Sequence, residues 1–170
     1  IYQRLDQLID SSEYRGRIEF TYIGRLPEGV RFRNSKVCRP LSGNALSTEI
    51  KKHHVYITAS RNEPGPNHPV EGANCGLPLF YIESGSMPEY CRGFGVSFKE
   101  GTFQEKLEKL IAQYDLIVAK MKSYPFTGQR MCSQYHSLFE QLLESRDQYI
   151  ASRNLWRRPL WRILNTLHPR

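Results

Sequence analysis

A glycine- and proline-rich stretch from Ser60 to Pro78 constrains the fold of this chain more than any other feature. It lies between two short apolar segments, which predict buried strands over 54–59 and 78–82. A helix is predicted over 67–75, and a strand, a helix and a second strand in this order form a right-handed parallel crossover. Ligands of open α/β sheets bind beyond the carboxyl ends of the strands. The polar residues of the stretch are therefore expected at such an edge.

The rest of the chain continues this alternation of strands and helices. We expect further helices over 1–13 and 43–53 and further strands over 17–23, 35–39 and 94–98. The predicted fold class is α/β, a Rossmann-like parallel sheet with flanking helices, followed by two long C-terminal helices.

The first long helix is predicted to start at a capping box, Thr102 to Glu105, and to run to Met121 with its apolar stripe in the core. Pro125 ends it, and the second helix is predicted over 129–152. One side of this second helix carries Met131, Tyr135, Leu138, Phe139, Leu142 and Leu143.

The cysteines and aspartates do not suggest a metal site. The four cysteines lack zinc or redox spacing, so we expect reduced, mostly buried thiols. The chain contains no D-x-D pair, and its aspartates fall in predicted helices, so we expect no metal at a diphosphate site.

The C-terminal tail, 153–170, supplies most of the net charge of +7, because it has five arginines and no acid. Its residues Trp156, Leu160, Ile163, Leu164 and Leu167 would share one face of a helix starting near Pro159. Two interpretations stay open: contact with an anionic membrane surface, or packing on another domain. Nucleic-acid binding is not expected. The sequence shows no leader and no membrane span, and we expect a cytoplasmic protein, peripheral to a membrane under the first interpretation.

The start of the helix predicted over 67–75 suits a phosphate group, because its free N–H groups and positive dipole end favour an anion. Glu71 could then accept hydrogen bonds from ribose hydroxyls, and Glu63 could reach a sugar. In the alternative interpretation, Glu71 complements the helix dipole and Glu63 is a solvated loop residue. The spacing of the two carboxylates decides nothing, since Glu100 and Glu108 repeat it.

Three segments carry a resemblance to a known family. ASRNEPGPNHPVEGANCGLP, followed by ESGSMPEYC and FGVSF, resembles the C-terminal, nucleotide-sugar-binding half of retaining GT-B glycosyltransferases of the group-1 type. The similarity is specific over Val55 to Phe98. It implies an enzyme that transfers a hexosyl-type group from a nucleotide diphosphate sugar to an unknown acceptor with retention, without a metal or other cofactor.

The resemblance also implies roles for individual residues. Glu63 would be the catalytic-site carboxylate that faces the donor sugar near the reacting centre, and Glu71 would bind the ribose. Backbone amides after Glu63 would bind the sugar and diphosphate. Because Pro64 and Pro66 replace residues that carry an N–H, these contacts fall to Gly65, Asn67 and His68.

Other residues near this corner are weaker candidates. The side chain of His68 could contact a phosphate or a sugar hydroxyl, or serve a structural role. Further donor-binding candidates are Arg61 for the diphosphate and Ser84, Gly85 and Ser86, which precede a helix start predicted at Met87. Arg39 and Leu41 follow a predicted strand beside the same crevice and are candidates for nucleobase contact.

The predicted organisation has three parts. Residues 1–124 form the nucleotide-sugar-binding domain without its first strand, 125–152 a helix packing on it, and 153–170 the basic tail. The resemblance also implies an Arg/Lys pair that binds the diphosphate and an N-terminal domain that binds the acceptor. Because the first strand of the nucleotide-sugar-binding domain is expected to be missing, we expect both to lie upstream, and this chain alone is expected to be incomplete and inactive. The alternative functions are a non-catalytic nucleotide-sugar or carbohydrate-binding module, and a membrane-surface or partner-binding domain.

Overall fold

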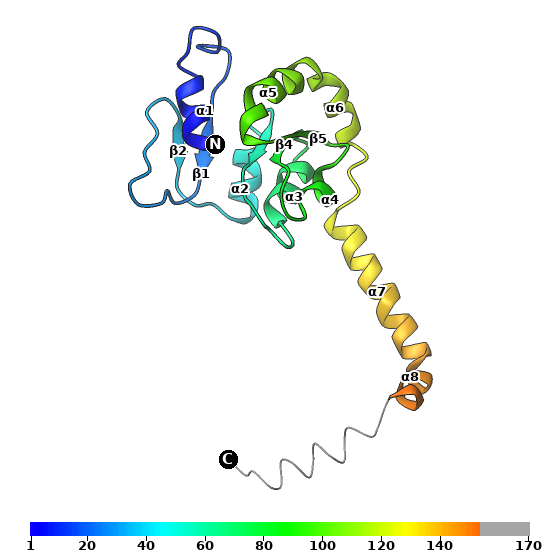
Figure 1. Ribbon diagram of the computed structural model, residues 1–170. Coiled ribbons are helices and arrows are strands. Elements are labelled where there is room, and N and C mark those ends of the chain that lie inside the picture. The colour runs from blue at the N-terminus through cyan, green and yellow to red at the C-terminus, as the bar shows by residue number, and fades with distance from the viewer. Residues whose placement is uncertain (154–170) are drawn as a thin grey trace, which may run out of the picture. The chain divides into compact units, whose positions relative to one another are not determined.

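The computed structural model describes residues 1–153 of the chain (Figure 1). The chain divides into two compact units, Ile1–Thr127 and Gly128–Arg170. The expectations for Trp156 to Leu167 and for the rest of the tail after Arg153 lie outside the described residues. The predicted packing of 125–152 on the domain and the missing first strand stay predictions.

The first unit contains two parallel sheets, which confirms the predicted α/β, Rossmann-like class. The strands are β1 (Thr21–Ile23), β2 (Lys36–Cys38), β3 (Tyr56–Thr58), β4 (Leu79–Ile82) and β5 (Gly95–Phe98). One sheet pairs β1 with β2, and the other has the order β3-β4-β5. In the larger sheet, Tyr56 is in register with Leu79, and Leu79 with Gly95. The structure thus differs from the single sheet expected.

Helices and connections alternate with these strands as predicted. The helices of the first unit are α1 (Tyr2–Leu8), α2 (Gly43–Ile50), α3 (Asn67–Asn74), α4 (Met87–Cys91), the 3-10 helix η1 (Glu100–Thr102), α5 (Phe103–Ala112) and α6 (Tyr114–Met121). The helix predicted over 1–13 is too long, because α1 ends at Leu8 and irregular turns follow.

The prediction of one helix from Thr102 to Met121 is wrong. The backbone of Gln113, at φ −104° and ψ 9°, separates α5 from α6, and the two helices form an arc beside β4 and β5 in Figure 1. The bend keeps Leu110 of α5 and Ile117 of α6 buried, whereas Ile111 is 40% exposed. Burial of both apolar faces on one curved core explains the break.

The predicted capping box is also wrong. The N–H of Lys99 donates to Thr102 Oγ1 at 3.1 Å, so the Thr102 side chain closes η1 and makes no capping bond to α5. The Thr102 hydroxyl forms its hydrogen bond within this 3-10 turn, and it is therefore not available to cap α5 as the sequence motif predicted.

The core of the first unit lies around β4, whose four residues are all buried. The ring of Phe80 lies 4.4 Å from that of Phe98 and 5.4 Å from that of Phe103, measured between centroids. At Gly72 in α3, an added Cβ would lie 2.4 Å from the Tyr56 ring. Glycine at this position therefore lets the crossover helix pack directly on β3.

The helix α1 joins the smaller sheet to the larger one. The Tyr2 ring stacks on Phe20 with centroids 5.8 Å apart, and its edge-to-face partner Tyr22 lies on β1. The Tyr2 hydroxyl also accepts a hydrogen bond from the Ala59 N–H, directly after β3, at 3.0 Å. One side chain therefore contacts both sheets.

Asp6 of α1 fixes the loop before β2. Its carboxylate accepts hydrogen bonds from the N–H groups of Arg33 and Asn34, both at 2.9 Å, and from the Ser35 hydroxyl at 2.6 Å. Burial alone would raise the pKa of Asp6, but these donors outweigh it and hold the pKa below its usual value. The ionised carboxylate therefore stabilises this loop.

The second unit contains α7 (Gly128–Glu144) and α8 (Arg146–Ser152). The single helix predicted over 129–152 is interrupted at Ser145, whose backbone lies at φ −92° and ψ 10°. The predicted apolar side of α7 is solvent-exposed, with Leu143 72% and Phe139 57% exposed. Among the described helices, none combines the length and hydropathy needed to cross a bilayer.

The cysteines are all free thiols, as predicted for a reduced chain. The expectation that most are buried is wrong: Cys91 is buried, Cys38 and Cys75 are half-buried, and Cys132 is exposed. Cys132 lies on α7, where no core surrounds it.

Candidate functional site

Two loops meet at the carboxyl ends of β3 and β4. The backbone oxygen of Glu63 accepts hydrogen bonds from the Ser86 N–H at 3.0 Å and from the Ser86 hydroxyl at 2.8 Å. The Asn62 N–H donates to the Ser84 hydroxyl at 3.0 Å. The structure therefore brings the predicted residues Glu63, Ser84 and Ser86 together, and they fix the shape of the edge.

Both loops adopt backbone conformations that few residues reach. Asn62 is the non-glycine residue with positive φ among those described, at φ 55°, a conformation that asparagine tolerates better than most side chains. Gly85, at φ 57°, approaches the Glu63 backbone so closely that a Cβ would lie 2.7 Å from its nitrogen and its oxygen. Gly85 therefore permits the contact between the loops.

The candidate anion site is the start of α3, next to the Glu63 loop. The helix begins at Asn67 after Pro66, and no side chain caps it. The N–H groups of Asn67 and His68 in its first turn have no partner within a helix by geometry, so they can bind an acceptor from a ligand, whereas the next residue, Pro69, has no N–H. Gly65 precedes the turn and is exposed. This arrangement agrees with the predicted placement of all three residues.

The His68 ring is half-buried between α3 and β3. Its Nε2 lies 2.8 Å from the hydroxyl of Thr58, which is only 1% exposed. Burial lowers the pKa of His68, and the negative charge of Glu63 partly opposes this shift. His68 is therefore a neutral imidazole at neutral pH, and Glu63 is near enough to affect it electrostatically.

Glu71 lies apart from this group. Its side chain is exposed on the second turn of α3, and it contributes to the raised pKa values of Tyr56 and Cys75, for which burial is the larger cause. Within residues 1–153, no hydrogen bond or ion pair joins Glu71 to Glu63. A ligand would have to extend along α3 to contact both carboxylates.

Arg61 is already engaged by another side chain. Its guanidinium forms an ion pair with the Glu100 carboxylate, and both side chains are more than half exposed. Arg61 is therefore a surface arginine with a carboxylate partner. Contact with a diphosphate would require Arg61 to exchange Glu100 for the ligand, an inexpensive change because exposed ion pairs contribute only about 0–1 kcal/mol.

The nucleobase candidates lie in the connection after the smaller sheet. Arg39 and Leu41 follow β2, with Arg39 exposed and Leu41 half-buried. Within the described residues, no hydrogen bond or ion pair joins either side chain to the Glu63 loop. Their role in base recognition stays a prediction.

Sequence reasoning missed two site residues, Thr58 and Tyr2. Thr58 is a polar residue in an apolar strand, and its alternation with Ile57 could have identified it as a side chain facing the site edge. Tyr2 could not have been identified, because its hydrogen bond to Ala59 spans 57 positions of the sequence.

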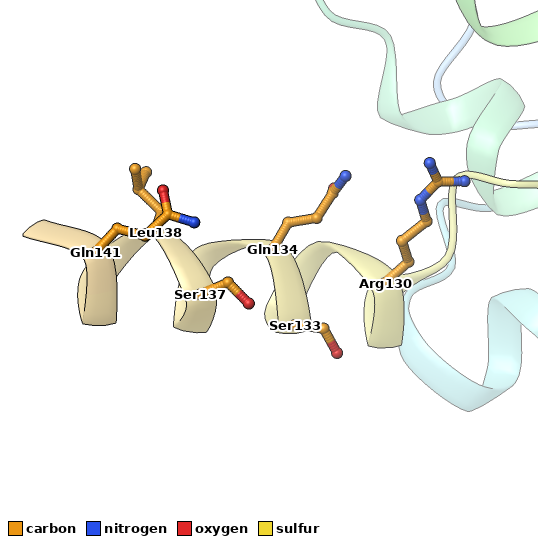
Figure 2. A pocket seen from close by; sticks show the side chains of 6 residues that line it. All are labelled: Arg130, Ser133, Gln134, Ser137, Leu138 and Gln141. Atoms are coloured by element: carbon orange, nitrogen blue, oxygen red, sulfur yellow. The ribbon is translucent and has the colours of Figure 1, made fainter.

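Other parts of the structure add no further candidate to this edge. Among residues 1–153, no group of three or more His, Cys, Asp or Glu side chains is arranged to hold a metal ion. A shallow hollow on α7 is lined by Arg130, Ser133, Gln134, Ser137, Leu138 and Gln141 (Figure 2). All six belong to one helix, so the hollow is an open surface between side chains.

Comparison of the chain with protein-family models, with curated proteins and with solved structures finds no match.

Proposed function

We propose that this chain is the donor-binding half of a retaining GT-B-type glycosyltransferase, which binds a nucleotide diphosphate sugar and transfers the glycosyl group to an unknown acceptor. The observation that carries the proposal is the uncapped start of α3 directly beside the Glu63 loop. A diphosphate at this helix start would meet free N–H groups and the positive end of the helix dipole.

The chemistry that this edge offers is stabilisation of a leaving group. As the glycosyl bond breaks, negative charge grows on the diphosphate, and fixed backbone donors stabilise such charge without reorganising. The amides of Gly65, Asn67 and His68 would supply these donors. Glu63 would face the sugar, and its backbone is fixed by Ser86 for that role.

The remaining parts of the enzyme are assigned to other segments. An N-terminal domain would bind the acceptor and provide the cationic pair for the diphosphate. We place the protein in the cytoplasm, where nucleotide sugars are available, with no resident metal required for the donor site. The proposal requires nucleotide binding by this chain even without transfer activity.

Calorimetric titration of the chain with UDP, ADP and GDP tests the proposal. We expect saturable binding of at least one nucleotide and a loss of about 10-fold in affinity for Glu71→Ala, since one bidentate hydrogen-bonding carboxylate is removed. Glu105→Ala is the matched control, because Glu105 is also an exposed helical glutamate. Equal affinities for the two variants and the unmodified chain would rule out the ribose role of Glu71.

A second candidate function, binding to a protein partner or to a membrane surface, is favoured by α7. Its exposed apolar residues Met131, Tyr135, Leu138, Phe139, Leu142 and Leu143 form a continuous side of the helix. Exposed apolar surfaces of this kind mark sites that bind a partner or a membrane surface. Flotation with vesicles of phosphatidylcholine alone and with added phosphatidylserine tests this, and equal amounts of free protein with and without vesicles would exclude the membrane.

A further inference from the structure

A chain of buried polar groups leads from α1 through β3 to the candidate site. The Tyr2 hydroxyl accepts a hydrogen bond from the Ala59 N–H, and the hydroxyl of the neighbouring residue Thr58 contacts His68 Nε2 at 2.8 Å. Thr58 is almost fully buried. A buried hydroxyl must find partners for its proton and its lone pairs, so the direction of each hydrogen bond can be worked out.

The neighbours of Thr58 determine where its proton goes. The Ser60 N–H donates to Thr58 Oγ1 at 3.4 Å. Among the partners of Thr58 Oγ1 within residues 1–153, His68 Nε2 is the one that can accept a proton. Thr58 Oγ1 then accepts from the Ser60 N–H, and its own proton is donated to His68 Nε2.

We infer that Thr58 is a positioning residue that holds neutral His68 in the tautomer with its proton on Nδ1, leaving Nδ1–H to donate to an anionic oxygen of the donor substrate. The identity of that ligand rests on the proposed function, whereas the tautomer does not. In water, the ring proton of neutral histidine can lie on either nitrogen. When one nitrogen accepts a hydrogen bond, the proton is fixed on the other nitrogen.

The surroundings of His68 agree with this assignment. Among the described residues, the bond to Thr58 is the hydrogen bond that the His68 side chain makes, so Nδ1 is the nitrogen available to a ligand. The titratable groups that face the ring are Glu63 from the loop after β3 and Tyr56 from β3, whose ring lies 6.3 Å away. A donor at Nδ1 would lie beside the free N–H groups of the first turn of α3 and add to them.

Nitrogen-15 NMR of the histidine side chains in the full chain tests the tautomer, because protonated and unprotonated ring nitrogens have different chemical shifts. Above the His68 pKa, we expect a protonated Nδ1 and an unprotonated Nε2. In Thr58→Val, the proton should move toward Nε2 and the titration midpoint should rise by about 0.5–1 pH unit, since the neutral form loses one hydrogen bond. Thr58→Ser should keep both wild-type values.

Two further variants keep the test decisive if Thr58→Val fails to fold. Thr58→Ala removes the same hydroxyl with a smaller side chain and should also move the proton toward Nε2, whereas Tyr135→Phe, on α7, should not. A wild-type His68 protonated on Nε2, or an unchanged spectrum in both Thr58→Val and Thr58→Ala, would overturn the inference.

Nucleotide titration of the same variants separates this inference from the proposed function. We expect Thr58→Val to weaken binding of the nucleoside diphosphate by about 10-fold, as for one lost charge-assisted hydrogen bond, and Thr58→Ser to preserve it. Unchanged affinity in Thr58→Val would overturn the donor role of Nδ1–H. Absence of nucleotide binding to wild type would instead contradict the proposed function, and the NMR result would still decide the tautomer.

Discussion

Gly85 approaches Glu63 more closely than any residue with a side chain could, since a Cβ at Gly85 would lie 2.7 Å from the Glu63 nitrogen and oxygen. This approach sets the distance between the loops that follow β3 and β4. The Ser86 hydroxyl, one residue later, holds the Glu63 carbonyl. The position of the candidate catalytic carboxylate therefore depends on a glycine in the neighbouring loop.

Gly85→Ala should destabilise the fold by about 2–4 kcal/mol, as a positive φ costs about 1 kcal/mol for alanine and overpacking against backbone adds about 1–3 kcal/mol. Gly93→Ala is the matched control, because Gly93 has φ 88° but no atom within 4 Å of an added Cβ. It should cost only about 1 kcal/mol. Urea unfolding measures both, and equal costs would show that the loops separate easily.

Gly72→Ala should loosen α3 from β3. Alanine in an exposed helix stabilises by about 1 kcal/mol relative to glycine, but here the added Cβ would lie 2.4 Å from the Tyr56 ring. We expect a net loss of about 1–2 kcal/mol in the free energy of unfolding. Gly128→Ala, with nothing within 4 Å, should be neutral or stabilising. A stabilising Gly72→Ala would contradict the close packing.

Asp6→Asn should destabilise the chain by about 1–3 kcal/mol at pH 7, since it weakens the hydrogen bonds from Arg33, Asn34 and Ser35. The pKa of Asp6 is lower in the folded state, so its contribution is present above the unfolded pKa of about 4 and is lost as the pH falls through the folded pKa. The difference between wild type and variant in urea unfolding should therefore shrink below about pH 4.

Asp10→Asn is the control for this pH dependence. Asp10 forms an ion pair with Arg15, and both side chains are more than half exposed, so its removal should cost about 0–1 kcal/mol. A difference between Asp6→Asn and wild type that stays constant from pH 7 to pH 2 would contradict the role of the ionised carboxylate.

Phe139→Ala should change stability by less than about 0.5 kcal/mol, because Phe139 is 57% exposed on α7. Phe80→Ala, at a position that is 1% exposed, should cost about 3–5 kcal/mol. Thermal unfolding at two protein concentrations measures both. A large, concentration-dependent cost for Phe139→Ala would show that α7 is covered by a second copy in solution.

The sequence predicted the parts of the fold that depend on local pattern. The apolar run at 79–82 and the turn residues around Gly65 were enough to place β4 and the start of α3, because periodicity and turn chemistry act over a few residues. The bend at Gln113 was missed, since the apolar spacing continues through it. Tertiary packing of two helices on one core decides such a bend.

The candidate site was predictable to a similar extent. Local pattern placed Glu63 and His68 at one sheet edge, which the structure confirms. It could not predict that Arg61 pairs with Glu100, 39 positions away, or that Tyr2 reaches β3. Interactions between residues so distant in sequence are set by topology, and a single sequence does not reveal them.

An amide NMR titration of the nitrogen-15-labelled chain with UDP, ADP and GDP in turn tests the nucleotide site most directly. We expect saturable shifts for the amides of Asn67, His68 and Gly85, smaller shifts around Glu71, and none on α7. Saturable shifts confined to α7, or no shift at millimolar nucleotide, would contradict a nucleotide-sugar site at the carboxyl edge of β3 and β4.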